Sequence, residues 1–308
     1  MHESCRQTYT GIPESSSGIN NRSDLVAIFS NQATLTYNGN TTNSNIAYGE
    51  ILDVLTATKT AIEGSYTRGD LVTYVVTLRN TGSTALTGLT LTDDLGGYPF
   101  GAGTVYPLTY VPGSATYYTN GVLQPAPVVT AGPPLSVTGL SVPAGGNALL
   151  IYEASINSFA PLAVGSTITN TATASGGGIS APVSATETIT AGQQATLTIS
   201  KSLSPTVVTE NGQLTYTFII ENTGNTPAVA TDNIVVTDTF DPILDPIAVT
   251  FNGTPWTAGV NYTYNAATGE FATIAGEITV SAATYTQNPD GTWTITPGVS
   301  TLTVTGTV

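Results

Sequence analysis

Apolar and polar residues alternate along most of the chain after residue 25. The segments 71–78 and 214–220 alternate with a period of two and are rich in β-branched and aromatic residues, which is typical of half-buried strands. Turn signals such as Asn120-Gly121 and Asp290-Gly291 separate these runs. No segment keeps a helical period over several turns. The pattern therefore predicts an all-β chain built from antiparallel β-sandwiches.

The alternating pattern occurs twice along the chain. Lys59 and Lys201 lie 142 positions apart, and the strands around them match at the same spacing. A repeat of this length is a domain rather than one turn of a solenoid. We predict two tandem Ig-like antiparallel β-sandwiches, over residues 56–191 and 195–308, joined by a short linker.

The repeat starts and stops out of phase with these domains. Residues 29–36, Phe-Ser-Asn-Gln-Ala-Thr-Leu-Thr, resemble residues 168–175, Ile-Thr-Asn-Thr-Ala-Thr-Ala-Ser, which close the first domain. The second domain has no such closing segment of its own, so we expect it to lack its last strands. Residues 25–55 are predicted to form a donor strand or hairpin that completes the second domain of a neighbouring copy, behind a flexible leader over residues 1–24.

Charge and hydropathy exclude several classes of partner. Charged residues make up only 8 % of the chain, against about 25 % in an average protein. The net charge is −14, so no nucleic acid is expected as a partner. No apolar run approaches the ~18 residues of a membrane-spanning helix. The first 28 residues also lack the apolar core of a secretory signal peptide, which leaves open a signal removed earlier or another route to the surface.

Two residue types that carry much of enzyme chemistry are nearly absent. His2 is the only histidine and Cys5 is the only cysteine. The folded part therefore has no Ser-His-Asp or Cys-His catalytic set and no histidine-rich metal site. We expect neither an enzyme nor a cofactor. Cys5 could link neighbouring chains through a disulfide, and an unpaired thiol fits the sequence equally well.

The only two lysines occupy equivalent positions, and both fall in the apolar row of a strand. Alternation places Lys59 on the same face as Leu55 and Ala57, and Lys201 on the same face as Leu197. Burying a lysine is costly unless it is paired, and burial lowers its pKa. Each lysine is therefore expected to have a polar partner inside its domain.

In the first domain, Asp93 and Asn170 also lie in apolar rows. A lysine, an aspartate and an asparagine that face inward are the set that forms a spontaneous isopeptide bond. A neutral amine attacks the asparagine amide, and a buried acid relays the protons. We predict a self-cross-link between Lys59 and Asn170 within one subunit, promoted by Asp93.

The second domain has Lys201 and Asp238 but no inward asparagine at the matching place. Asn31, in the N-terminal segment, stands where Asn170 stands in the first domain. We therefore predict a second bond, between Lys201 and Asn31 of the neighbouring subunit, promoted by Asp238. A different interpretation of both sets remains open, namely a buried lysine–aspartate ion pair beside a hydrogen-bonded asparagine.

The motifs of the repeat resemble those of a bacterial surface repeat called domain of unknown function 11 (DUF11). They are Lys59, Gly69-Asp70, Val72 to Tyr74, Asn80 to Gly82, Thr92-Asp93 and Asn170 to Thr173 in the first copy, and Lys201, Gly212, Tyr216, Asn222 to Gly224 and Thr237-Asp238 in the second. The resemblance covers nearly everything after residue 25. It implies Ig-like sandwiches of long bacterial and archaeal surface proteins, and similar repeats occur in clostridial spore appendages.

The sequence favours a structural subunit of a self-assembling extracellular fibre, pilus-like or a spore appendage. Its partner would be a second copy of itself in a head-to-tail homopolymer on the cell or spore surface. The alternative is a stalk or binding module of a surface adhesin. These two functions differ in whether the protein polymerises alone.

Overall fold

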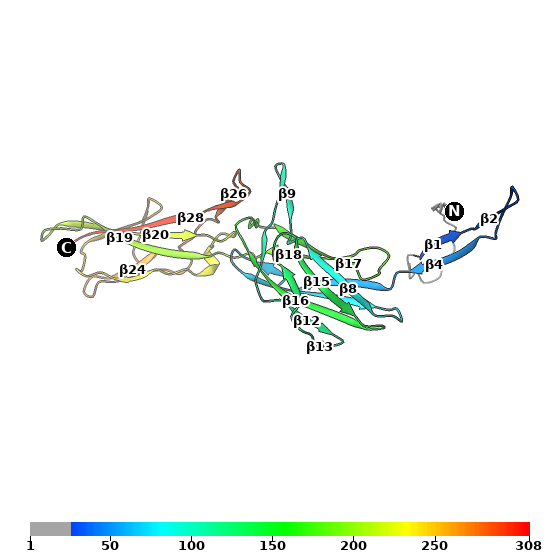
Figure 1. The fold of residues 1–308 in the computed structure, drawn as a ribbon. Coiled ribbons are helices and arrows are strands. Elements are labelled where there is room, and N and C mark those ends of the chain that lie inside the picture. The colour runs from blue at the N-terminus through cyan, green and yellow to red at the C-terminus, as the bar shows by residue number, and fades with distance from the viewer. Residues whose placement is uncertain (1–25) are drawn as a thin grey trace, which may run out of the picture.

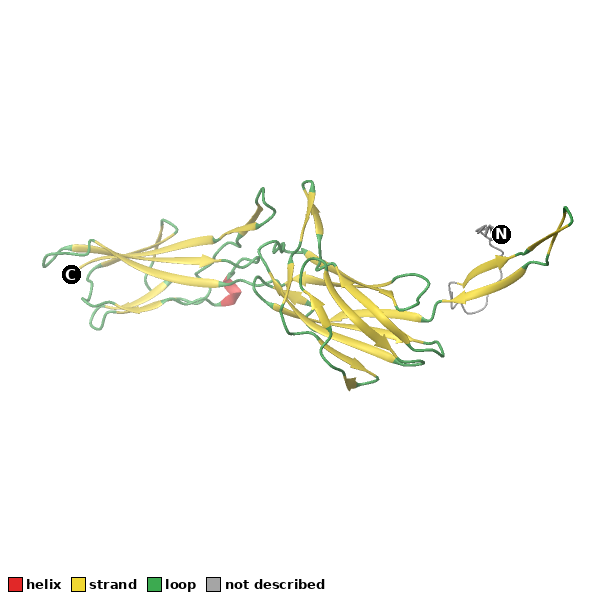
Figure 2. Ribbon diagram, viewed as in Figure 1, coloured by secondary structure: helices red, strands yellow, loops and turns green. Residues whose placement is uncertain are grey.

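The computed structural model describes residues 26–308, which form three parts along one extended molecule (Figure 1). A small N-terminal unit lies at one end, a first sandwich in the middle and a second sandwich at the other end. Nearly every element is a strand (Figure 2), and the one helical turn of this range is the 3-10 helix η1 (Ala230–Asp232). The prediction of an all-β fold is confirmed.

Two further predictions concern the N-terminal leader and the absence of a membrane-spanning helix. The leader over residues 1–24, with Cys5, lies outside the described residues. Across residues 26–308, no helix is long and apolar enough to cross a membrane.

The first sandwich is a complete two-layer structure. Its strands are β5 (Leu55–Ala61), β6 (Ser65–Tyr66), β7 (Leu71–Asn80), β8 (Leu86–Asp93), β9 (Tyr98–Phe100), β10 (Gly103–Val105), β11 (Leu108–Tyr110), β12 (Thr116–Thr119), β13 (Val122–Leu123), β14 (Val128–Thr130), β15 (Leu135–Val142), β16 (Asn147–Ile156), β17 (Thr167–Gly176) and β18 (Val183–Ala191). One sheet has the order β13-β12-β16-β7-β5, with β11 also paired to β16, and the other has the order β14-β15-β8-β17-β18-β6. The pairs are antiparallel except the short β6–β18 pair, which is parallel.

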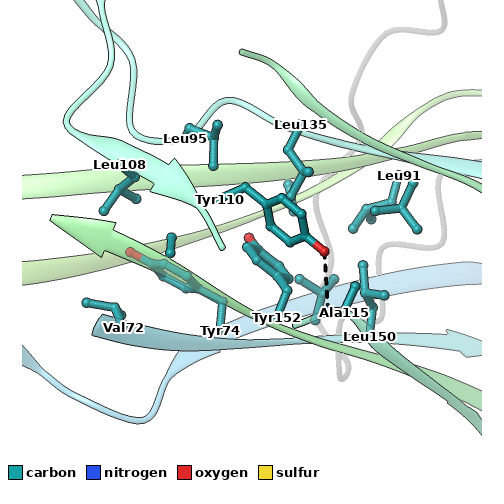
Figure 3. Packing of buried hydrophobic residues seen from close by; sticks show 14 of the residues in the cluster. Val72, Tyr74, Leu91, Leu95, Leu108, Tyr110, Ala115, Leu135, Leu150 and Tyr152 are labelled. Carbon is teal, nitrogen blue, oxygen red and sulfur yellow. Dashed lines mark hydrogen bonds between the residues drawn. The ribbon is translucent and has the colours of Figure 1, made fainter. Parts of the chain in front are cut away.

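The core of the first sandwich lies between its two sheets. Every second residue of β7 is buried, including Tyr74 and Val76, and these side chains pack against Leu89 and Leu91 of β8 in the opposite sheet. This is the result of the alternation in the sequence, because successive strand residues point to opposite faces. Figure 3 shows Tyr74 beside Tyr152 in this core, where their stacked ring centroids are 5.7 Å apart.

The second sandwich has one large sheet and only a small one facing it. Its strands are β19 (Leu197–Ser204), β20 (Gln213–Asn222), β21 (Thr237–Thr239), β22 (Ile247–Phe251), β23 (Thr254–Trp256), β24 (Tyr262–Asn265), β25 (Glu270–Thr273), β26 (Thr284–Gln287), β27 (Trp293–Thr296) and β28 (Gly298–Thr307). The large sheet has the order β19-β20-β28-β22-β23, and the small sheet has the order β21-β25-β24. The pair β26–β27 forms a separate hairpin, which we call the clasp hairpin.

The second sandwich is open where the first is closed. In the first, β8 is paired on both edges, by β15 and by β17. In the second, the equivalent β21 pairs with β25 alone among the strands of residues 26–308. The strand that would face this gap is exposed: Leu197 and Ile199 of β19 are 36 % and 55 % exposed, whereas Leu55 of β5 is 4 % exposed.

The N-terminal unit is a long hairpin, which we call the donor hairpin. In it, β1 (Val26–Asn31) pairs with β4 (Ala47–Leu52), and β2 (Thr34–Tyr37) pairs with β3 (Asn40–Asn43). In the described part of the chain, these four strands pair only with one another. Phe29, Leu35 and Tyr37 are half or more exposed. A two-stranded hairpin of this kind is marginally stable alone in water, so its exposed apolar side chains favour docking onto another surface.

The clasp hairpin joins the second sandwich to the first. The backbone N–H of Trp293 donates to the carbonyl of Ser158 at 2.9 Å, and the guanidinium of Arg68 donates to the Trp293 carbonyl at 2.8 Å. The Gln287 amide donates to the Tyr98 hydroxyl at 3.0 Å. The Asn225 amide adds a further bond outside this hairpin, donating to the Leu162 carbonyl of the first sandwich at 2.9 Å.

Candidate cross-linking sites

The first candidate site lies between the two sheets of the first sandwich. Lys59 comes from β5 in one sheet, while Asp93 ends β8 and Asn170 lies on β17 in the other. The pairing of Ala172 with Asp93 places Asn170 beside the aspartate, because residues two apart on a strand share a face. All three polar residues are buried. The sequence therefore predicted correctly that these side chains face inward.

Asp93 is the centre of the hydrogen bonds in this site. Lys59 Nζ lies 2.5 Å from Asp93 Oδ2, and both side chains are shielded from solvent. The Tyr152 hydroxyl donates to the same oxygen, and the backbone N–H of Leu95 donates to Oδ1 at 2.9 Å. The structure thus brings Lys59 and Asp93 into direct contact. Tyr152 is a further partner of the aspartate that the sequence did not identify.

Asn170 and Tyr74 are buried without hydrogen-bond partners. Neither the Asn170 amide nitrogen nor its oxygen has a partner among residues 26–308, and the same is true of the Tyr74 hydroxyl. A buried polar atom without a partner costs about 1–3 kcal/mol, so three in one cluster are unusual. Lys59 Nζ lies 4.7 Å from the centroid of the Tyr74 ring, so these groups surround the same amine.

Burial shifts the pKa values of the lysine and the tyrosines in this cluster. Desolvation lowers the pKa of Lys59, although the nearby Asp93 acts in the opposite direction. Desolvation also raises the pKa of Tyr74 and Tyr152, and Asn170 lies near enough to lower both somewhat. Burial therefore shifts the Lys59 amine toward its neutral form, which is the form that acts as a nucleophile.

Alkaline pH is expected to destabilise the first sandwich through its buried tyrosines. The pKa values of Tyr74 and Tyr152 are raised above 10.0, so at high pH the unfolded chain loses protons that the folded chain keeps. The free energy of unfolding then falls by about 1.4 kcal/mol per tyrosine for each pH unit. Guanidinium denaturation curves at several pH values above about 11.5, where Lys59 is mostly neutral in both the folded and the unfolded state, would measure this slope. A flat profile there would contradict the burial of these hydroxyls.

The second candidate site is assembled only in part. Lys201 Nζ contacts Asp238 Oδ2, and the amine lies 4.4 Å from the centroid of the Tyr216 ring, as Lys59 lies over Tyr74. The Lys201 side chain is nevertheless 40 % exposed. Val304 pairs with Tyr216 where Tyr152 pairs with Tyr74, so the second site has no hydroxyl equivalent to that of Tyr152.

Asn31 lies apart from Lys201 in this structure. It ends β1 of the donor hairpin and is exposed, at the end of the molecule opposite to the second sandwich (Figure 1). The predicted set of Lys201, Asp238 and Asn31 is therefore not brought together within one chain. The bond between Lys201 and Asn31 of a neighbouring subunit therefore stays a prediction.

The tyrosines are the functional candidates that the sequence analysis did not select. Tyr74 is part of the repeated motif and is matched by Tyr216. Tyr152 falls in the buried row of β16. Alternation places both in the core, but the hydrogen bond from Tyr152 to Asp93 depends on how the two sheets face each other, which strand patterns do not reveal.

No family model matches the chain, so the resemblance to DUF11 remains a prediction from its motifs. No curated protein sequence matches it. The pilus backbone RrgB from Streptococcus pneumoniae is 10 % identical with a TM-score of 0.32, over 76 % of this chain and 52 % of that one; this chain thus spans about half the length of RrgB.

Two other solved structures are similar at the same level. The major pilin subunit BcpA of Bacillus cereus is 12 % identical with a TM-score of 0.32, over 88 % of this chain and 74 % of that one. AvmM, which catalyses macrocyclization in alchivemycin A biosynthesis, is 12 % identical with a TM-score of 0.27, over 53 % of this chain and 97 % of that one.

Proposed function

We propose that the chain is a structural subunit of an extracellular fibre that polymerises head to tail by donor-strand complementation. The observation that carries this proposal is the match between two exposed surfaces of the same chain. One is the open side of the second sandwich, and the other is the apolar face of the donor hairpin. In the first sandwich the two corresponding surfaces are buried against each other.

The open side of the second sandwich has the features of a strand acceptor. The edge of β21 that faces the gap has no partner among the described strands, and an unpaired edge is a template for another strand. Beside it, Leu197 and Ile199 are exposed. In the first sandwich, β17 pairs with β8 on this side, and β18 lies against β5.

The donor hairpin carries the side chains that this acceptor would take. Its residues align with β17 so that Asn31 stands where Asn170 stands, and the neighbouring apolar residues follow the same alternation. Phe29 takes the place of Ile168, which is fully buried in the first sandwich. The hairpin therefore resembles β17 and β18 in both side-chain pattern and pairing.

The order of segments makes the assembly propagate. Two residues separate β4 from β5, and five separate β18 from β19, so each closing hairpin leads directly into the next sandwich. A subunit that inserts its donor hairpin into a neighbour's second sandwich presents its own second sandwich at the far end. Such a heterologous contact does not close on itself and gives an open filament.

Covalent bonds would reinforce this assembly. Lys59 would join Asn170 inside each first sandwich, with Asp93 relaying protons. Docking of the donor hairpin would bury Lys201 and bring Asn31 to it, which supplies the proximity that the second reaction needs. Unassembled subunits would then react at Lys59 alone.

Electron microscopy of the purified protein, followed by gel electrophoresis after boiling in detergent and reductant, tests this function. Fibres that survive boiling as a ladder of multimers are expected, because peptide-like bonds along the fibre resist both treatments. Intact mass of the unassembled subunit should show the loss of one ammonia. A protein that stays monomeric at high concentration would instead be a stalk or binding module of an adhesin.

A further inference from the structure

The Tyr74 hydroxyl is a buried polar group that the proposed cross-linking reaction does not yet use. It lies in the core of the first sandwich and has no hydrogen-bond partner among the described residues. The Asn170 amide, in the same cluster, has none either. A single hydrogen bond between the two would satisfy both Tyr74 and the Asn170 oxygen. The two side chains lie near enough for Asn170 to lower the pKa of Tyr74, so this bond is within reach and would offset the cost of burying both groups.

The other hydroxyl of the cluster, that of Tyr152, already donates a hydrogen bond. Tyr152 donates to Asp93 Oδ2, the oxygen that also contacts Lys59. A phenol has one hydrogen to donate, so Tyr152 cannot serve the Asn170 oxygen while it holds the aspartate. Tyr74 is thus the free donor among the groups around the amine.

The two repeats support a role for this tyrosine that Tyr152 does not share. Tyr216 occupies the position of Tyr74 and carries Lys201 over its ring, at 4.4 Å compared with 4.7 Å for Lys59. The position of Tyr152 is Val304 in the second sandwich. A tyrosine under the lysine is therefore common to both sites, while the donor to the aspartate belongs only to the first.

We propose that Tyr74 is a catalytic residue of the first cross-linking site, donating its hydroxyl hydrogen bond to Asn170 Oδ1 while Lys59 attacks. This inference rests on the proposed Lys59–Asn170 bond. Tyr152 acts through Asp93 and is a positioning residue. Tyr216 would take the role of Tyr74 at the bond between subunits.

The reaction balances without an outside reagent. The lone pair of neutral Lys59 Nζ forms a bond to Asn170 Cγ, and the electron pair of the carbonyl moves onto Oδ1, where Tyr74 stabilises the negative charge. Asp93 accepts a proton from Nζ and passes it to Nδ2. The Cγ–Nδ2 bond then breaks and ammonia leaves, so the product is a secondary amide with no change of oxidation state.

Tyr74→Phe tests the proposal, because it removes the hydroxyl and keeps the ring under the amine. The whole chain is made by cell-free synthesis and sampled over time, and intact mass in denaturant measures the loss of ammonia. Removing one donor of this kind slows a reaction about 10²–10³-fold, so Tyr74→Phe should accumulate unreacted protein. Tyr66→Phe is the matched control, since it removes a buried hydroxyl of the same sandwich that bonds to the Pro161 carbonyl, and it should lose ammonia at the wild-type rate.

Two measurements separate this role from a structural one. In the unreactive Asn170→Ala background, Tyr74→Phe should leave the melting temperature unchanged or raise it, since it removes an unpartnered buried hydroxyl. Replacing tyrosine by 3-fluorotyrosine makes the hydroxyl a stronger donor. It should speed ammonia loss in the wild type and have no such effect in Tyr74→Phe.

Three results would overturn the proposal. Tyr74→Phe that loses ammonia at the wild-type rate would exclude the hydroxyl from the reaction. A lower melting temperature in the Asn170→Ala background would make Tyr74 a structural residue. If the wild-type protein never loses ammonia, the Lys59–Asn170 bond does not form and the proposal fails with it. Fibres seen by electron microscopy would in that case still support the proposed assembly.

Discussion

Phe29→Asp is expected to abolish fibre formation, whereas Ser30→Asp is expected to leave it intact. The two positions are adjacent on β1 and point to opposite faces of the donor hairpin. Phe29 corresponds to the buried Ile168, and Ser30 corresponds to the exposed Thr169. Docking would bury the new carboxylate at position 29 without a partner, which costs at least several kcal/mol and weakens docking by more than a hundredfold. Negative-stain microscopy and light scattering at matched concentration would compare the variants.

Removal of residues 1–52 provides an independent test of the same interaction. The truncated chain keeps both sandwiches but has no donor hairpin, so it should remain monomeric or aggregate through its open second sandwich. A synthetic peptide covering residues 26–52 should then bind with a one-to-one stoichiometry and suppress the aggregation. Normal fibres from the truncated chain, or equal fibres from Phe29→Asp and Ser30→Asp, would refute donor-strand assembly.

Asn31→Ala is expected to form fibres that fall apart into monomers in hot detergent. The substitution leaves the apolar row of the donor hairpin in place, so docking should persist with a loss of about 1 kcal/mol. It removes the amide that Lys201 would attack, so no bond can form between subunits. Gel electrophoresis after boiling measures the difference as the loss of the multimer ladder.

Asn170→Ala is the matched control for this experiment. It removes the equivalent amide inside the first sandwich, so the unassembled subunit should no longer lose ammonia. Its fibres should still give a ladder, because Lys201 and Asn31 are unchanged. A ladder that survives in Asn31→Ala would mean that the bond between subunits uses other residues.

The sequence predicted the burial of three polar residues in the first sandwich because burial there depends on alternation. Lys59, Asp93 and Asn170 all interrupt apolar rows, and a strand period of two is enough to turn such residues inward. The same reasoning placed Lys201 inward, yet its side chain is 40 % exposed. The direction was correct, but the strand that would cover it is missing from its own sandwich in the described structure.

Contacts between sheets and between domains could not be predicted in this way. Tyr152 reaches Asp93 only because two sheets face each other in one register. The turn at Asp290-Gly291 indicated a hairpin, but nothing in residues 284–296 shows that it docks on Tyr98 and Ser158 of the other sandwich. These contacts depend on how whole sheets and domains pack against each other, and the pattern of a single strand carries no information about that packing.

The clasp hairpin has a mechanical consequence for the proposed fibre. In the second sandwich, Ala283 bonds to Gly224, and β28 begins fifteen residues later, with the clasp hairpin in between. In the first, Gly145 makes the same bond to Gly82, but β16 begins only two residues later. Between Gly145 and β16 the first sandwich therefore has no counterpart of the clasp hairpin that could bond to the second sandwich of a neighbouring subunit. The joint between the two sandwiches of one subunit would be stiff, and the joint between neighbouring subunits would be more flexible. The filament would therefore bend mainly at every second joint.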